Sequence, residues 1–456
     1  MPLTNENRRG IRLGVILVGR KRPGFDQEWN RIMTGRCLSV LEQLGYSVVR
    51  TEEPVVDEPT TVAALKKVQQ AGCEALLLLQ PSIAHGQLAL TVAQRWSDPV
   101  ILWATPERPG DGKVSSCSLV GQHLWASSLR QAGRPFEFLY GDPDDSAVRG
   151  DLTRAIKLTR AAFRLHRSRV GLVGTHAPGF IDLAPEPFLL RKALGIQLYP
   201  LSLPQFIERV REIPEEAVRQ DVQRVQELKL PLRDVVADDL AMNSRCYLAM
   251  RELIDGEGLD ALAIQCWPEL PNLLGQWPYL AVSRLSTEGR AVAIEGDVDG
   301  AISSLIGLLL GTGAGFLTDW LEHDRNTIFF WHPGMAPMDM CDGPGCEGAP
   351  TLAAHFNIVK PLVVDGSIRI NEPVTILRLW RCDNQYHLTA FEGQTIEPRR
   401  KLTGNTALVE VAEGSVPERF ERLLHAGMPH HVLVSFGRHR EALRRLCRLL
   451  GLQWWD

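Results

Sequence analysis

Two short apolar runs, each followed by acidic residues, constrain most strongly how this chain can fold. Ala261–Cys266 and Arg290–Ile294 are bounded by glycine or charged residues and are short enough to be buried strands. Glu269 follows the first run, and Glu295 and Asp297 follow the second. Ligands of open α/β sheets bind outside the carboxyl ends of the strands. If the two runs are neighbouring strands, Glu269 and Asp297 lie at one crevice, where paired carboxylates can hold a hard divalent metal or transfer protons.

The sequence before this stretch predicts further strands that alternate with helices. The segment RVGLVG at residues 169–174 follows a basic helix at 152–166 and begins a second series of alternating elements. Alternation of this kind predicts βαβ units and a parallel sheet. In the first series we expect strands at residues 11–18, 47–49, 75–79 and 98–106, with a helix at 62–70.

From residue 358 onward the pattern changes to short alternating segments, such as SIRINEPVTILRLWR, that are separated by Gly, Asn and Pro. Regular spacing of this kind predicts an antiparallel sheet or a small barrel. A chain of 456 residues is also too long for one core. We therefore expect two Rossmann-like α/β domains, at residues 1–165 and 166–289. A β-rich, barrel-like C-terminal domain with one helix is expected at residues 290–456.

Composition limits the compartment and the partners. The formal net charge of −4 gives no electrostatic reason to expect nucleic acid or an anionic membrane as a partner. The nine cysteines are scattered and odd in number, and several lie in apolar runs, as expected for buried thiols in a reducing compartment. The polar start MPLTNENRRG and the lack of a long apolar run predict a cytoplasmic protein without a membrane span.

Each candidate residue also has a structural interpretation. Asp297 precedes an apparently helical segment, Val298–Leu310, and aspartate is a favoured N-cap. Glu295 can pair with an arginine, and Glu269 can be a solvated loop acid. His430–His431 starts the strand HHVLVSFG, where the pair either completes a metal site with two carboxylates or forms a turn with one exposed ring.

Two further motifs are weak. His332, in FFWHPG, lies on a Gly/Pro loop after an apolar run, a setting typical of site loops. Cys341-x4-Cys346 has the spacing of half a zinc knuckle, but no second cysteine pair is nearby in the sequence, and we interpret it as a flexible loop.

Several segments together resemble the L-fucose isomerase / L-arabinose isomerase family, and more specifically its shorter fucose-isomerase-like branch. The segments occur in the expected order over nearly the whole chain. They are VGRKRPGFDQEW, DPVILWATPE, CWPEL, PYLAVSRLSTEGRAVA, EGDVDGA, FFWHPG, HFNIVKPLVVDGSIRINEPVTILRL and HHVLVSFG.

The resemblance implies a metal-dependent aldose–ketose isomerase that acts on an open-chain sugar through an enediol. It implies Mn²⁺, or another divalent ion such as Co²⁺ or Mg²⁺, held by a glutamate, a second acid and a C-terminal histidine. Carried over to this sequence, these ligands are Glu269, Asp297 and His431, and the two acids also form the catalytic acid/base pair.

The resemblance also implies contacts with the monosaccharide. His430 takes a position that contacts the substrate in the family, and we expect His332 and Trp267 to contact it as well. Arg20 is expected to reach sugar hydroxyls or an anionic substituent, in a site near a subunit interface of a homo-oligomer (hexamer or trimer). The sugar is left open and includes deoxy and 6-substituted or acidic sugars. Two alternatives remain: an epimerase with the same metal site, and a non-catalytic sugar-binding or regulatory protein.

Overall fold

Three sheets organise the protein. The computed structural model describes residues 10–21, 25–110, 112–343 and 348–456. The chain forms two compact units, Met1–Arg164 with Arg445–Gly451 and Leu165–Arg444 with Leu452–Asp456. Unit 1 holds one parallel sheet, and unit 2 holds a second parallel sheet and a barrel-like sheet. This confirms the predicted fold class, whereas the two domain boundaries, after residues 165 and 289, stay a prediction.

The sheet of unit 1 has the strand order β2-β1-β3-β4-β5 and is parallel throughout. Its central strands are continuous apolar runs because helices cover both of their faces. The strands are β1 (Arg12–Leu17), β2 (Ser47–Arg50), β3 (Ala75–Gln80), β4 (Val100–Ala104) and β5 (Phe136–Tyr140).

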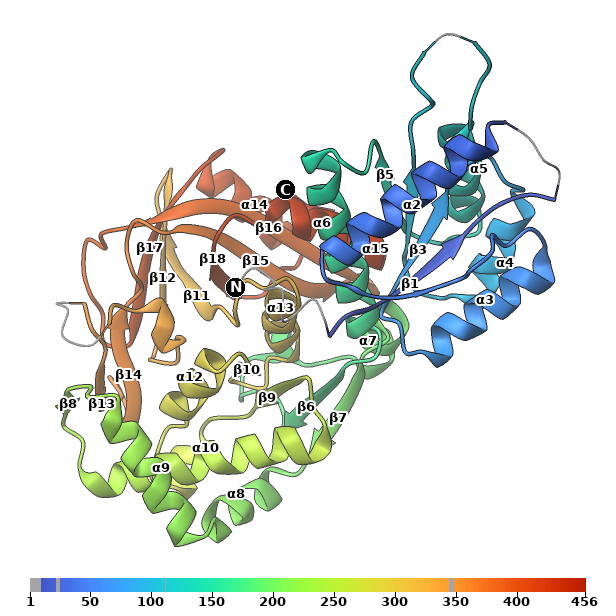
Figure 1. Ribbon diagram of the computed structural model, residues 1–456. Coiled ribbons are helices and arrows are strands. Elements are labelled where there is room, and N and C mark those ends of the chain that lie inside the picture. Colours follow the sequence, from blue (N-terminus) through green and yellow to red (C-terminus); the bar gives the residue numbers. More distant parts are fainter. Residues whose placement is uncertain (1–9, 22–24, 111, 344–347) are drawn as a thin grey trace. The chain divides into compact units, whose positions relative to one another are not determined.

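The helices of unit 1 divide between the two faces of this sheet (Figure 1). One face packs against α2 (Gln27–Gln43) and α6 (Ser146–Leu165). The other packs against α3 (Glu58–Gln70), α4 (Gln87–Arg95) and α5 (Ser118–Gln131). Aspartate caps begin α2 and α3, where each side chain accepts a hydrogen bond from a backbone N–H of the first turn.

The parallel sheet of unit 2 has the strand order β10-β9-β6-β7. Ala261 pairs with Ala291, so the two apolar runs of the sequence are neighbouring strands, as predicted. The strands are β6 (Arg169–Val173), β7 (Gln197–Leu201), β9 (Ala261–Ile264) and β10 (Ala291–Ala293). The helices of this region are η1 (Ile181–Leu183), α7 (Pro187–Leu194), α8 (Leu203–Glu212), α9 (Glu215–Glu227), α10 (Ala237–Glu257), α11 (Glu269–Leu273), α12 (Tyr279–Thr287) and α13 (Val298–Leu309).

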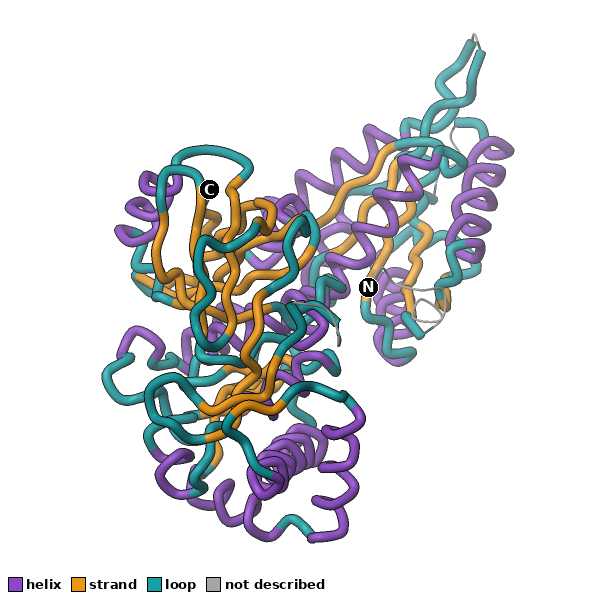
Figure 2. The backbone as a smooth tube through the Cα atoms, turned by 90° about the vertical axis from the view of Figure 1, so that its left-hand side faces the viewer, coloured by secondary structure: helices purple, strands orange, loops and turns teal. Residues whose placement is uncertain are grey.

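The third sheet closes on itself. β16 pairs with both β15 and β17, so β16, β15, β18, β11, β12 and β17 form an antiparallel barrel around an apolar core. Figure 2 shows its strands in orange. The elements are β8 (Leu232–Arg233), β11 (Phe316–His323), β12 (Thr327–His332), η2 (Met338–Met340), β13 (Thr351–Ala354), β14 (Pro361–Ser367), β15 (Pro373–Cys382), β16 (Gln385–Ile396), β17 (Asn405–Val411), α14 (Val416–His425), β18 (His431–Phe436), α15 (Arg440–Leu450) and β19 (Gln453–Trp455).

Helix α13 joins the two sheets of unit 2, because it contacts β9 and β10 on one side and β15 and β18 on the other. The helix is buried over its first ten residues. Its N-terminus therefore lies where the parallel sheet faces the barrel. No helix in the described part of the chain is long and apolar enough to cross a membrane.

Candidate metal centre

A strained turn after β10 places Glu295. The backbone φ angle is +58° at Glu295 and +69° at Gly296, a region that non-glycine residues seldom adopt. A Cβ atom on Gly296 would lie 2.3 Å from the carbonyl oxygen of Thr175, so this position requires glycine. The indole Nε1–H of Trp267 donates to Oε1 of Glu295 over 2.9 Å. The turn and the indole together fix the carboxylate of Glu295.

Three neighbouring barrel strands supply the groups that face this carboxylate. Asp319 in β11 is paired in register with His431, the first residue of β18. His332 is the last residue of β12. Strand β11 lies between β18 and β12 and pairs with both. His332 and His431 are buried, with 2% and 0% of their surface exposed.

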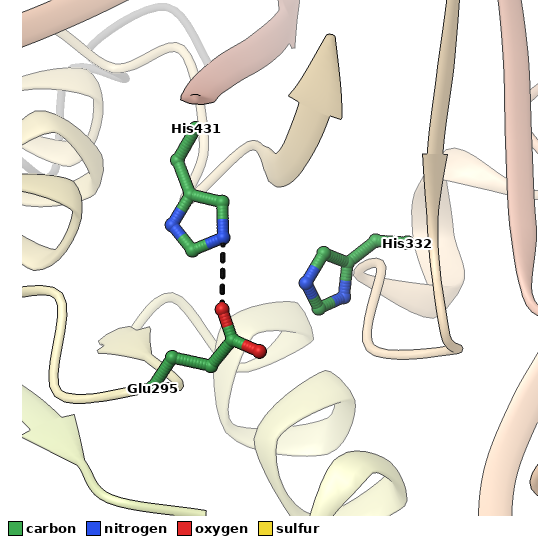
Figure 3. A group of neighbouring side chains, drawn as sticks. All are labelled: Glu295, His332 and His431. Carbon is green, nitrogen blue, oxygen red and sulfur yellow. Dashed lines mark ion pairs between the residues drawn. The ribbon is translucent and has the colours of Figure 1, made fainter. Parts of the chain in front are cut away.

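The donor atoms converge at His431. Its Nε2 atom lies 3.1 Å from Oε2 of Glu295 and 3.7 Å from Oδ1 of Asp319. Figure 3 shows the imidazole of His332 turned toward the same carboxylate. Donor atoms of Glu295, His332 and His431 all lie within 4.8 Å of one another, and so do those of Asp319, His430 and His431.

The other ring nitrogen of His431 is anchored by Asp297. Nδ1 lies 2.9 Å from Oδ2 of Asp297, whose oxygens also accept hydrogen bonds from the guanidinium of Arg378 at 2.6 and 2.9 Å. The N–H of Gly300 donates to Oδ1 over 2.8 Å. A carboxylate behind a histidine orients the ring and directs its second nitrogen to a metal.

The side chains fit a divalent metal. Within the described residues, His332 Nδ1 is buried and has no hydrogen-bond partner. Buried nitrogens without a partner are costly unless something binds them. Two imidazoles beside carboxylates suit Mn²⁺ and similar divalent transition ions.

The pKa values favour the ionised form of the Glu295 carboxylate. Burial raises the pKa of Glu295, but the contact with His431 outweighs it and lowers the pKa to about 2. Burial lowers the pKa of His431, yet its contacts with Asp297 and Glu295 raise it to about 10. Burial lowers the pKa of His332 to about 4. At neutral pH Glu295 is therefore ionised, His332 is neutral, and His431 is positively charged, with a proton on each ring nitrogen.

The structure gives the two predicted acid ligands, Glu269 and Asp297, different surroundings. Glu269 is the first residue of α11 and accepts a hydrogen bond from Nε2 of Gln265 over 2.7 Å. Neither of the two metal-capable groups among the described residues contains it. Asp297 is the N-cap of α13, which confirms the structural interpretation, and its carboxylate is fully buried against Arg378 and His431. We therefore assign the ligand positions to other acids.

The predicted substrate contacts are distributed between the two units. Trp267 and His430 lie beside the centre: Trp267 bonds Glu295, and the ring centroid of His430 lies 4.4 Å from that of His431. Arg20 belongs to unit 1, where it lines a pocket of about 770 Å³. Cys341 is buried, and its predicted companion Cys346 lies outside the described residues.

The sequence analysis missed Asp319 and gave His332 a different role. Asp319 lies within the apolar strand segment FLTDWL, and an acid in such a strand is a signal that points to a site. Glu295 also follows the second apolar run, but the acid carried over from the family resemblance was Asp297.

No protein-family model matches the chain. Proteins named sulfoquinovose isomerase match it over nearly their full length. The protein from Priestia megaterium (strain ATCC 12872 / QMB1551) is 28% identical over 443 residues, 96% of this chain and 97% of the relative. That from Alkalicoccus urumqiensis is 27% identical over 386 residues (83% and 85%), and that from Clostridium sp. (strain MSTE9) is 24% identical over 438 residues (94% and 96%). These matches support a sugar isomerase family.

Among solved structures, an ABC transporter periplasmic solute binding protein from Actinobacillus succinogenes 130z with bound D-allose matches 66% of this chain and 91% of its own. The identity is 12% and the TM-score is 0.17, so this match carries no argument about fold or function.

Proposed function

We propose that the protein is a metal-dependent aldose–ketose isomerase and that its substrate is a sulfonated aldose such as sulfoquinovose. The observation that carries the proposal is the convergence of donor atoms of Glu295, His332 and His431 in the interior, where Nδ1 of His332 has no hydrogen-bond partner among the described residues. The names of the near-full-length relatives support the reaction and the substrate. The same substrate falls within the 6-substituted acidic sugars that the sequence left open.

We assign the metal ligands to Glu295, Asp319, His332 and His431. When bound, a divalent ion such as Mn²⁺ supplies positive charge that stabilises negative charge on the two reacting oxygens of the open-chain sugar. Asp297 holds the ring of His431 through Nδ1 so that Nε2 faces the ion. Arg378 in turn balances the charge of Asp297 in the interior.

Isomerisation moves one proton from C2 to C1 and another from O2 to O1. A carboxylate must take the carbon-bound proton to give the enediol and return it to C1. We assign this work to Glu295 and Asp319, whose carboxylate oxygens lie 3.1 and 3.7 Å from Nε2 of His431. Glu295 is ionised at neutral pH, as a base must be, and Trp267 orients its Oε1 atom. Asp319, whose side chain is 28% exposed, is placed to exchange protons with the sugar oxygens.

We further propose that the protein acts as a homo-oligomer and that Arg20 binds the sulfonate. Arg20 lines its pocket at the carboxyl end of β1, next to residues that follow β3. In the strand order β2-β1-β3-β4-β5 this is the point where the order reverses, a common place for ligands. Mixing the Arg20→Ala chain, which has a raised KM, with the inactive His431→Ala chain tests a shared site. Activity with the wild-type KM in the mixture requires that one copy completes the site of another.

Turnover of sulfoquinovose and uncharged aldoses in D₂O tests the proposal. The protein should be stripped with EDTA, then supplied with Mn²⁺, Co²⁺ or Mg²⁺. We expect ketose to form only with metal, and deuterium to enter at the carbon next to the carbonyl. Exchange without ketose would indicate an epimerase. Failure to bind metal, or metal binding without turnover or exchange on any sugar, would contradict the proposal.

A further inference from the structure

His430 has a ring nitrogen that the proposed ligand set does not use. Its Nδ1 atom lies 2.9 Å from Oδ2 of Asp182 in η1. Its Nε2 atom is buried and, among the described residues, has no hydrogen-bond partner. The side chain as a whole is 36% exposed. Nδ1 of His430 therefore contacts Asp182, and Nε2 points into the protein interior.

His430 lies beside the metal centre. A ring nitrogen of His430 lies within 4.8 Å of donor atoms of both Asp319 and His431. Because Nδ1 is engaged by Asp182, Nε2 is the nitrogen that remains for a ligand.

The segment that carries Asp182 is attached to the centre at two more points. The N–H of Ala177 donates to the backbone oxygen of Glu295 over 2.9 Å. The ring of Phe180 meets Trp267 and His430 edge-on, with centroid separations of 5.6 and 4.8 Å. Asp182 is therefore held in place by the same loop that supports Glu295.

The chemistry of the pair defines what Nε2 can do. An ionised carboxylate only accepts hydrogen bonds, so the nitrogen that faces it carries the proton. The neutral imidazole then has its lone pair on the other nitrogen. We propose that Asp182 is a positioning residue that keeps His430 in the Nδ1–H form, so that Nε2 accepts a hydrogen bond from a hydroxyl of the open-chain sugar. This inference rests on the proposed isomerase function.

A double-mutant cycle tests the inference. Asp182→Ala should raise KM for sulfoquinovose about tenfold, the effect of one lost hydrogen bond, with kcat within about twofold. Asp182→Asn should recover most of the loss because its amide oxygen still accepts the Nδ1 proton. In a His430→Ala background, Asp182→Ala should have no further effect. Metal affinity should be unchanged in all four proteins.

A second readout does not depend on activity. Nitrogen NMR of the ¹⁵N-histidine-labelled wild type at pH 8.5, assigned by the resonances that His430→Ala removes, should report an unprotonated Nε2. Asp182→Ala should convert these resonances to a mixture of the two neutral forms. An unchanged spectrum, an equal loss in the His430→Ala background, or a lower metal affinity in His430→Ala would overturn the inference. If the wild-type protein binds metal but converts no sugar, the proposed function itself fails. The proposal that Nε2 accepts a hydrogen bond from a sugar hydroxyl then fails as well.

Discussion

The two parallel sheets of this protein offer the same kind of edge for different chemistry. In unit 1 the carboxyl ends of the strands border a pocket lined by Arg20, Arg31, Glu52 and Glu53. In unit 2 the corresponding edge carries Glu295 and is covered by barrel strands that add an acid and two histidines. Among the described residues, the metal-capable groups lie in unit 2 alone. A sheet edge thus provides a position for a ligand, and the element packed against it decides the chemistry.

The largest expected effect comes from removing the nitrogen at which the unit 2 donors converge. His431→Ala should abolish stoichiometric metal binding and reduce kcat by at least about a thousandfold, because the ion and its charge stabilisation are lost together. Elemental analysis of dialysed protein and the D₂O assay measure both. The control is His425→Ala, at the exposed end of α14, which should behave as wild type. A His431→Ala protein that keeps its metal would contradict the claim that the metal binds at the sheet edge of unit 2.

A smaller effect concerns the stability of unit 2 rather than its chemistry. Asp297→Asn leaves the buried guanidinium of Arg378 without a countercharge and should lower the free energy of unfolding of the metal-free protein by about 3 kcal/mol. Asp255→Asn breaks an exposed pair with Arg290 and should cost less than about 1 kcal/mol. Urea unfolding measures both. Equal values for the two variants would show that the Asp297 pair has no special role.

These residues also show how far the sequence could lead. The alternation of strands with helices predicted the parallel sheets, because strands buried on both faces are continuous apolar runs. The condition that the runs Ala261–Cys266 and Arg290–Ile294 are neighbouring strands is met, since Ala261 pairs with Ala291. The facing partners could not be predicted, since Asp319 and His332 reach the centre only through the register of β11, β12 and β18. The positive φ angle that directs Glu295, rather than Asp297, into the centre is likewise a property of the folded turn.

Metal binding should depend on pH through one proton. The raised pKa of His431, about 10, means that this ring is protonated at neutral pH, and the ion must displace that proton. Glu295 is already ionised and His332 already neutral, so neither adds a proton to the exchange. Because falling pH strengthens the competing proton, apparent affinity should drop about tenfold per pH unit between pH 8 and 6. Calorimetry in buffers of different ionisation enthalpy should detect release of about one proton; no release would contradict this.

In unit 1 the expected effect falls on substrate binding alone. Arg20→Ala should raise KM for sulfoquinovose about tenfold, the value of one charge-assisted hydrogen bond, while KM for an uncharged aldose and metal affinity stay unchanged. Lys66→Ala, an exposed change on α3, is the control for loss of a positive charge. An equal rise in KM for sulfoquinovose and for an uncharged aldose would contradict the proposal that Arg20 binds the sulfonate.

The smallest effect is expected at Glu269. Since its carboxylate bonds Gln265 and lies outside the donor groups, Glu269→Gln should leave metal affinity within about twofold of wild type, a change within the usual range for a substitution away from a site. Asp319→Asn is the matched change at a proposed ligand and should weaken binding substantially. A Glu269→Gln protein that loses its metal would restore the pair first suggested by the sequence.

The central claim is where the ion binds, and anomalous diffraction from a crystal soaked in Mn²⁺ tests it most directly. Data collected on both sides of the manganese absorption edge locate the ion without assumptions about coordination. We expect one strong anomalous peak at bonding distance from Glu295, His332 and His431, with Asp297 behind the ring of His431. A peak coordinated by Glu269 and Asp297, or none in unit 2, would contradict it.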